Sequence, residues 1–229
     1  MIRPWADALA LAAMLGLAAP AQPGELSGRV TLSGPAPERP VFDRSSAPGC
    51  GPASADDDPL LISAEGGVQN AVVRLSGLTA PGSAAPLPPI TVEQRGCSYV
   101  PRVQAALKGQ PVVVVNGDAL LHNVHAFDGR RGLFNVAQPP GSRPVEKSAA
   151  GAEVLRLKCD IHPWMFGWVV YSENRYSAVT AADGRFAIRG VPPGTYQLSV
   201  WHELLGTKTL EIKVTNGPLK VNVLLPGPR

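Results

Sequence analysis

The sequence predicts an all-β protein. Its apolar runs are short and rich in β-branched residues, and turn-forming pairs such as Asn-Gly and Asp-Gly separate them. Glycine and proline number 24 each among 229 residues, so together they make about a fifth of the chain, against an average of about 12%. Long helices tolerate neither residue in their interior, so the composition argues against a helical bundle. Many short strands between regular turns are typical of β-sandwiches and barrels.

The clearest strands are expected at four short apolar runs, and turn signals bound them. Turns are expected at 33–35, 116–118, 128–129, 183–184, 192–194 and 216–217. Two longer stretches, 35–59 and 80–89, are rich in proline, alanine or acidic residues and are expected to be loops. The strand runs are Val72–Val73, Val112–Val115, Val169–Val170 and Val221–Leu225.

Composition excludes several classes of function. The chain is 45% hydrophobic and 17% charged, which is typical of a globular protein. Its formal net charge is only +3, and the lysines and arginines are scattered, so no nucleic-acid-binding surface is expected. With only four histidines, the chain lacks the ligands for a large multi-metal cluster.

The first 21 residues have the pattern of an export signal. Arg3 precedes an apolar run from Ala8 to Ala19, and the sequence Ala19-Pro20-Ala21 fits a small-x-small cleavage site. The run is too short to span a bilayer, which takes about 20 helical residues. An uncleaved anchor helix is the alternative. We expect cleavage after Ala21, no stable membrane insertion, and a periplasmic location where disulfides form.

A candidate metal site follows a strand in the middle of the chain. Alternate residues of a strand share a face, so Leu155, Leu157 and Cys159 are expected to point into the core. His162 and Met165 follow in the next loop, and His122 lies after the Val112–Val115 strand. Two histidines, one cysteine and a weak methionine favour copper. Zinc would take a harder fourth ligand or a second thiolate instead of a thioether.

The segment of about residues 87–171 resembles the cupredoxins, in particular the amicyanin and plastocyanin-like members. The matching strings are His122-Asn123-Val124-His125 and the run from Cys159 through His162-Pro163 to Met165. The resemblance implies a Greek-key β-sandwich and a type 1 (blue) copper held by His122, Cys159, His162 and Met165. It also implies that Asn123 supports the cysteine loop through hydrogen bonds. Exported proteins described as methylamine-utilisation-like combine such a domain with a second sandwich, and the mature chain resembles them.

The C-terminal part resembles another β-sandwich, the prealbumin-like carboxypeptidase regulatory-like domain. The match covers about residues 178–225 and rests on Asp183-Gly184 and on Pro192-Pro193-Gly194-Thr195-Tyr196. The strands that should precede it lie instead near the N-terminus. We therefore expect a discontinuous sandwich of residues 22–79 and 172–229, with a cupredoxin domain inserted at 80–171. The alternative is an N-terminal extension and a truncated C-terminal unit.

Two assignments at the metal site have alternatives. His125 could replace His122, but it lies three residues further along and faces the opposite side of an extended strand. Three cysteines in an exported chain leave one without a partner. With Cys159 as the copper thiolate, Cys50 is expected to pair with Cys97. The alternative pair, Cys97 with Cys159, would abolish the site.

The resemblance implies a one-electron carrier and not an enzyme, since no second metal site and no nucleophile–base pair is visible in the sequence. An exposed His162 with Pro163, Trp164 and Phe166 would form an apolar docking patch, although Trp164 and Phe166 could equally pack under the loop. The partner would be a redox protein such as a c-type cytochrome or a periplasmic dehydrogenase. The alternatives are a copper storage or delivery protein and a non-redox module that binds carbohydrate or protein.

Overall fold

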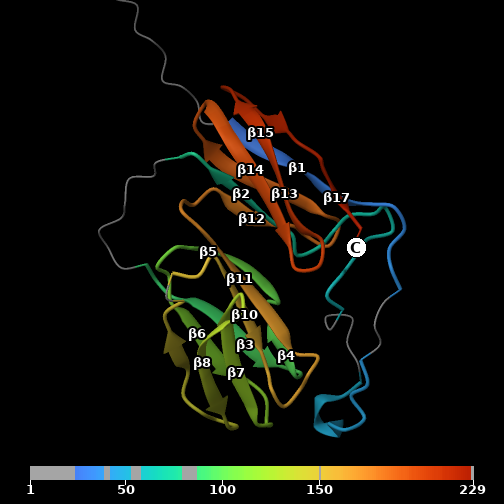
Figure 1. Cartoon of the computed structure of the whole chain (residues 1–229), viewed down its shortest axis with the longest axis vertical. Coiled ribbons are helices and arrows are strands. Elements are labelled where there is room, and N and C mark those ends of the chain that lie inside the picture. Colours follow the sequence, from blue (N-terminus) through green and yellow to red (C-terminus); the bar gives the residue numbers. More distant parts are fainter. Residues whose placement is uncertain (1–23, 39–41, 53–57, 79–86, 150, 228–229) are drawn as a thin grey trace, which may run out of the picture.

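The structure is a computed structural model, and it describes residues 24–38, 42–52, 58–78, 87–149 and 151–227. The expected export signal, residues 1–21, lies outside these residues. Within the described part of the chain the regular elements are β-strands and one short 3₁₀ helix, η1 (Pro48–Cys50), so the all-β prediction is confirmed. No helix among the described residues is long and apolar enough to cross a membrane. Figure 1 shows the strands gathered into two groups, one above the other.

The upper group, here called the terminal sandwich, combines strands from both ends of the chain. Its strand β1 pairs antiparallel with β13, with Gly28 opposite Phe186, and it pairs parallel with β16 and β17. Strand β2 lies in the facing sheet, between β12 and β14. The first sheet contains β13 (Arg185–Val191), β1 (Gly24–Ser33), β16 (Leu219–Lys220) and β17 (Val223–Pro226), and the second has the order β12 (Ser177–Val179), β2 (Val72–Ser76), β14 (Gly194–His202), β15 (Gly206–Val214).

Strand β1 shows how sequence and packing agree in this sandwich. Alternate residues of β1 are buried, and Leu26 and Val30 are fully enclosed in the core of the terminal sandwich. A period of two is the pattern of a strand with one face on the core. Glycine is required at position 28, because a Cβ there would lie 1.8 Å from the carbonyl oxygen of Val221. The β1 backbone therefore approaches the segment around Val221 closely, and strands from residues 24–33 and 219–226 share one sheet.

The lower group, here called the central sandwich, is built from residues 90–172. Its first sheet includes the parallel pair β5–β11, and its second includes the parallel pair β3–β6. Their buried side chains form a separate hydrophobic core. The first sheet has the order β5 (Val103–Leu107), β11 (Phe166–Ser172), β10 (Val154–Lys158), β7 (His122–Asp128), β8 (Arg131–Gln138), and the second has the order β4 (Ser98–Val100), β3 (Ile90–Arg95), β6 (Val112–Asn116), β9 (Val145–Lys147).

The two sandwiches meet through a small apolar cluster and a buried ion pair. Val72 of β2 packs with Val103 and Val170 of the central sandwich. The guanidinium of Arg102 and the carboxylate of Glu203 lie 2.8 Å apart, and both side chains are less than a tenth exposed. This contact joins the loop before β5 to the turn after β14, so each sandwich supplies one charge.

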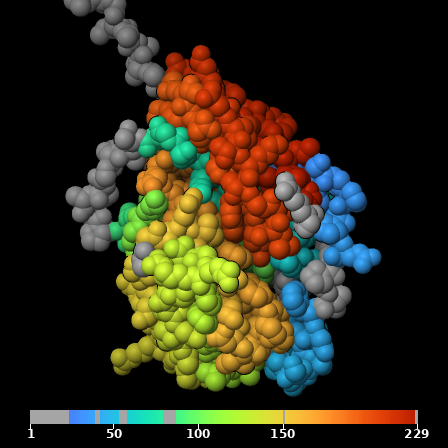
Figure 2. Space-filling model, viewed as in Figure 1, coloured from blue at the N-terminus to red at the C-terminus, as the bar shows by residue number. Residues whose placement is uncertain are grey.

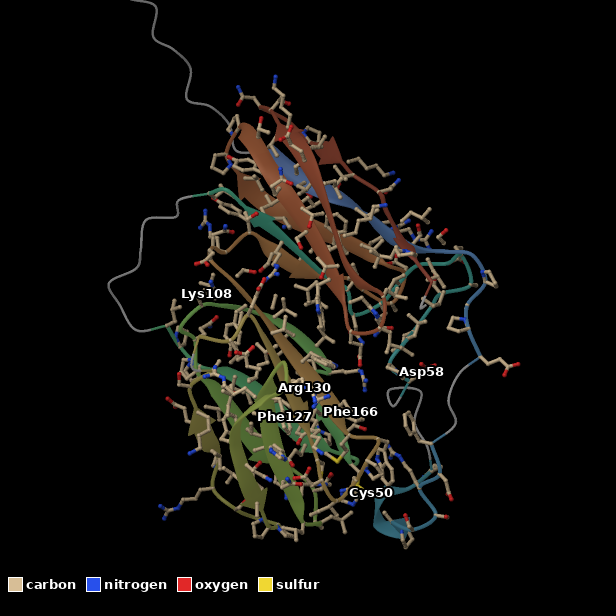
Figure 3. All side chains as sticks on the ribbon, in the orientation of Figure 1. Cys50, Asp58, Lys108, Phe127, Arg130 and Phe166 are labelled. Atoms are coloured by element: carbon tan, nitrogen blue, oxygen red, sulfur yellow. A yellow bond between two sulfur atoms is a disulfide. The ribbon has the colours of Figure 1, made fainter. Side chains whose placement is uncertain are left out.

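A loop segment outside both sandwiches covers one end of the central sandwich. This segment, residues 42–51, is here called the cap and contains η1. A disulfide joins Cys50 of the cap to Cys97, between β3 and β4, and Cys159 is the free cysteine. The cap lies against the lower sandwich in Figure 2, and Cys50 is labelled at the edge of that sandwich in Figure 3. Its position bears directly on the candidate site.

Candidate metal centre

Three elements of the central sandwich bring the candidate ligands together. His122 begins β7, and Cys159 follows directly after β10, the antiparallel neighbour of β7. His162 lies in the loop between β10 and β11. That loop folds back on itself, because the amide of Cys159 donates to the carbonyl of Met165 and the amide of Met165 donates to the carbonyl of His162. The loop thus returns His162 toward Cys159.

The donor atoms of His122, Cys159 and His162 converge. A ring nitrogen of each histidine and Sγ of Cys159 lie within 4.8 Å of one another, and all three residues are buried. Nδ1 of His122 is 3.0 Å from Nδ1 of His162, and Nδ1 of His162 is 3.7 Å from Sγ of Cys159. Met165 is also buried, in the same core cluster as Cys159. The sequence-predicted ligands therefore share one end of one core.

Asn123 ties the two ligand-bearing elements to each other. Its side-chain oxygen accepts hydrogen bonds from the Asp160 amide at 2.7 Å and from Sγ of Cys159 at 3.3 Å. Its side-chain nitrogen donates to the carboxylate of Asp160 and to the amide oxygen of Asn135. Because Asn123 directly follows His122 in the chain, these bonds fix the position of Cys159 relative to His122.

A carboxylate orients the ring of His122. Its Nε2 lies 2.9 Å from Oδ2 of Asp118, while Asp118 also accepts hydrogen bonds from the backbone amides of Gly96 and Cys97. Burial works against the ionised form of Asp118, but the backbone bonds and His122 outweigh it and lower the pKa of this carboxyl. An ionised carboxylate only accepts hydrogen bonds, so Nε2 of His122 carries a proton toward Asp118. Burial works against the imidazolium, but the hydrogen bonds to Cys159 and Asp118 outweigh it and raise the pKa of His122, so a metal ion that binds at Nδ1 displaces a proton there.

The surroundings also favour the thiolate of Cys159. Burial by itself raises the pKa of a thiol, but the hydrogen bond to His122 and backbone groups of Asn123, His162 and Ile161 outweigh it, and the pKa is lowered. Burial and the neighbouring His122 lower the pKa of His162, which favours the neutral imidazole. A thiolate and a neutral imidazole are the forms that bind metals.

The residues present fit a copper ion. A thiolate and two imidazoles, with a thioether nearby in the same loop, are soft and intermediate donors that suit copper in both of its common oxidation states. The hydrogen-bonded partners of the donors, Asn123 and Asp118, supply the outer contacts that orient metal ligands in proteins. The donor set and its support are therefore both present in this chain.

Among the described residues, His125 is not part of the cluster formed by His122, Cys159 and His162. Its side chain is 26% exposed, and its Nδ1 lies 2.9 Å from the carboxylate of Asp160. This carboxylate also accepts hydrogen bonds from Asn123 and Asn135 and pairs with Lys158. The role of His125 is therefore to hold the loop that follows Cys159, from the opposite side of β7 to His122.

The expectation that His162 is exposed is wrong, and for Trp164 the alternative, packing under the loop, is the one observed. His162 is 6% exposed and Trp164 is 3% exposed, whereas Pro163 is exposed and Phe166 is half-buried. The reason is the cap: the Arg44 guanidinium lies 5.2 Å above the Trp164 ring, whose centre lies 5.4 Å from that of His162. Trp164 also donates from Nε1 to the carbonyl of Cys97. Only Pro163 and part of Phe166 remain on the surface.

Sequence reasoning missed two features of the site. The pattern Asn116-Gly117-Asp118 indicates a turn. Nothing in this pattern indicates that Asp118 forms a hydrogen bond with His122, the candidate metal ligand four residues later. The second feature is the place of the disulfide: the predicted pair Cys50–Cys97 is present, but its two sulfur atoms and a ring nitrogen of His162 lie within 4.8 Å of one another. A cysteine count predicts a disulfide, but it does not predict which side chains the disulfide touches.

Each comparison with known proteins matches only part of the chain. The family model for polysaccharide lyase family 4, domain II, matches residues 165–220. A search of the curated proteins finds no match. Among solved structures, a purple cupredoxin from Nitrosopumilus maritimus is 22% identical with a TM-score of 0.31, and the alignment covers 36% of this chain and 99% of that one.

Two further structures match the chain at similar levels. Amicyanin from Paracoccus versutus is 23% identical with a TM-score of 0.33, over 37% of this chain and 81% of that one. A copper-containing nitrite reductase from Thermus scotoductus is 22% identical with a TM-score of 0.32, over 42% of this chain and 25% of that one. Scores of this size carry no argument about function. The likeness of the C-terminal part to a carboxypeptidase regulatory-like domain stays a prediction.

Proposed function

We propose that the chain is an exported type 1 copper protein that carries single electrons between redox partners. The observation that supports this most strongly is the convergence of His122, Cys159 and His162 at one end of a buried core. Met165 is proposed as the weak fourth ligand. Bound copper would supply reversible one-electron chemistry between Cu(II) and Cu(I).

The residues around the site are suited to a centre that changes its charge without moving its ligands. Asn123 fixes the start of the Cys159 loop relative to β7 by accepting from the Asp160 amide, a bond that does not need the thiol proton, and Asp118 fixes the ring of His122. Leu155 and Leu157 of β10 are fully buried beside Cys159, and together with Val169 they exclude water from the core side. Rigid, dry surroundings reduce the reorganisation that accompanies electron transfer, and the hydrophobic shell sets the reduction potential.

The location and the partner belong to the same proposal. The pattern of residues 1–21 supports export, and the Cys50–Cys97 disulfide suits an oxidising compartment such as the periplasm. The partner would be another redox protein, for which a c-type cytochrome and a periplasmic dehydrogenase are the two candidates. We propose a carrier and not an enzyme.

Voltammetry of the copper-loaded protein tests this proposal. A carrier gives one reversible one-electron wave, with the copper content unchanged after repeated cycling. Variants with Cys159→Ser or His162→Ala should lose the wave, whereas His125→Ala should keep it. Copper binding without a reversible wave, or a wave that survives Cys159→Ser, would show that the chain does not carry electrons through this site.

A further inference from the structure

The cap touches the loop that carries His162 and the loop that leads into β7, where His122 is the first residue. On one side, Arg44 stacks on Trp164, two residues after His162. On the other, the Gly49 backbone approaches Leu120, two residues before His122, so closely that a Cβ at position 49 would lie 3.1 Å from the leucine side chain. The cap therefore spans the outer edge of the candidate metal centre, and His162 is buried because of it.

Side chains hold the cap against the central sandwich. Its backbone hydrogen bonds given by the structure are local, from the Ala47 amide to Arg44, from Cys50 to Ala47 and from Gly51 to Pro48. Toward the sandwich, Arg44 donates at 3.1 Å to the carbonyl of Gly96 and at 3.3 Å to the hydroxyl of Ser98, and Phe42 and Ala47 pack against the central core. None of the ladders described for the sheets includes a cap residue. The Cys50–Cys97 disulfide is thus the covalent link that keeps the cap in place.

The disulfide lies directly beside the candidate ligands. Both of its sulfur atoms lie within 4.8 Å of a ring nitrogen of His162, and the sulfur of Cys97 lies within 4.8 Å of a ring nitrogen of His122 and a carboxylate oxygen of Asp118. Cys97 is fully buried, and Cys50 is 7% exposed between the exposed residues Gly49 and Gly51. A hollow of about 590 Å³ in the cap is lined by the neighbours Pro48 and Gly51 but not by Cys50 itself. Cys50 is therefore the less buried half of the disulfide, and an attacking thiol reaches its sulfur first when the cap shifts.

We propose that Cys50–Cys97 is a thiol–disulfide exchange site whose reduction lifts the cap and opens the metal centre, with a protein dithiol as the reductant. One thiolate of the dithiol attacks the sulfur of Cys50, the bond to Cys97 breaks, and Cys97 leaves as a thiolate that takes up a proton. The second thiol of the reductant then displaces Cys50. Two electrons and two protons pass to the chain, and the reductant becomes a disulfide.

This inference rests on the proposed function for its consequence. With the disulfide intact, the cap encloses the centre, so electrons can pass while the metal stays bound. With the disulfide reduced, the cap is held by Arg44 and by side-chain packing alone, so it opens more often and His162 becomes accessible. The same chain would then exchange copper with its surroundings, which it does not do when oxidised.

Histidine acylation tests the cap without copper. The metal-free Cys50→Ser/Cys97→Ser variant, the wild type, and the wild type reduced with excess dithiothreitol are treated with diethyl pyrocarbonate, and peptide masses give the rate at each histidine. Two other histidines serve as internal references: His125, which is 26% exposed, and His202, which is buried in the terminal sandwich. Ser46→Ala, on the exposed side of the cap, is the matched control that keeps the disulfide.

The expected result is that His162 reacts at least tenfold faster in the variant and in the reduced wild type, while His125 and His202 react as before. An unchanged rate at His162 overturns the proposal. A parallel increase at His202 also overturns it, because the disulfide would then hold the whole fold and not the cap.

A second measurement on copper-loaded protein follows the transfer of the metal to a Cu(I) chelator, with at least tenfold faster transfer expected in the variant. Faster acylation of His162 with an unchanged transfer rate would contradict control of the metal. If acylation of His162 is faster but the protein takes up no copper, the redox-controlled cap is supported and the proposed function as a copper protein is refuted.

Discussion

The carboxylate of Asp118 lies 2.9 Å from Nε2 of His122, on the side of the ring away from His162. The same carboxylate accepts hydrogen bonds from the amides of Gly96 and Cys97, the turn that carries one half of the disulfide. The orientation of a candidate metal ligand is therefore fixed by a turn on the opposite sheet. This relationship makes Asp118 a positioning residue and links the metal centre to the disulfide.

Replacement of Asp118 should weaken copper binding. In Asp118→Ala the ring of His122 loses the partner that fixes its protonated nitrogen, and the affinity for Cu(I) should fall about 10- to 100-fold. Asp118→Asn keeps an acceptor oxygen and should lose less. Competition with a Cu(I) chelator measures the affinity, and Asp128→Ala, at a more exposed aspartate at the end of β7, is the control. Equal affinities in wild type and Asp118→Ala would contradict the role given to this carboxylate.

Removal of the disulfide should lower the stability of the whole protein as well. Cys50 and Cys97 are 47 residues apart, and the loss of a cross-link that closes a loop of this length costs about 2–4 kcal/mol, because the unfolded chain gains freedom. Urea unfolding of metal-free Cys50→Ser/Cys97→Ser against Ser46→Ala measures the difference. A loss below about 1 kcal/mol would mean that removal of the disulfide gives the unfolded chain little additional conformational freedom.

Loss of the buried ion pair between the sandwiches should lower the free energy of unfolding more than loss of a surface ion pair. Glu203→Ala removes the carboxylate from a guanidinium that is 8% exposed, and the expected loss is about 3–5 kcal/mol. The double variant Arg102→Met/Glu203→Leu should recover part of it, since apolar side chains of similar size avoid the cost of a buried charge. Asp128→Ala, which breaks an exposed pair with Arg131, should lose about 1 kcal/mol or less. Equal losses in Glu203→Ala and Asp128→Ala would contradict this ranking.

Acid should destabilise the protein through His202. Burial and then the nearby Arg102 lower the pKa of His202 from 6.5 to about 4. Its Nδ1 accepts from the amide of Leu204, and its Nε2 has no hydrogen-bond partner among the described residues. Between pH 6.5 and 4 the unfolded state binds a proton that the folded state does not. The free energy of unfolding therefore decreases as the pH is lowered, by about 3 kcal/mol for a shift of this size.

His202→Gln keeps an acceptor for the Leu204 amide but does not titrate. Its free energy of unfolding should therefore fall less than that of the wild type between pH 6.5 and 4, with the difference seen in urea titrations at several pH values. The other groups near this ring, Arg102 with Glu203 and the backbone of Gln69, are unchanged in the variant. The same acid dependence in both proteins would assign it to other residues.

The features that sequence reasoning predicted are local in the chain. The alternation of Leu155, Leu157 and Cys159 predicts a buried cysteine at the end of a strand, and all three side chains are buried. The valine run at 112–115 lies in β6, and the run at 169–170 lies in β11. Successive side chains of a strand point to opposite faces of its sheet wherever the strand lies in the fold. These predictions therefore need no knowledge of the tertiary structure.

The features that it missed depend on distant segments. His162 and Trp164 are covered by a cap whose Arg44 lies 120 residues before Trp164 in the numbering. No periodicity in residues 42–51 indicates where that segment packs, and a cysteine count fixes no partner and no neighbour. Asp118 lies only four residues before His122 and was missed for another reason: an aspartate in an Asn-Gly-Asp turn has a local explanation that is sufficient by itself.

The visible absorption spectrum after addition of one equivalent of Cu(II) reports directly on whether Cys159 binds the metal. We expect an intense thiolate-to-copper band in the wild type and in Cys50→Ser/Cys97→Ser, and none in Cys159→Ser, with one copper per chain. A colourless wild type with no bound copper, or an equally intense band in Cys159→Ser, would contradict the assignment of Cys159, His122 and His162 as the ligands of a blue copper centre.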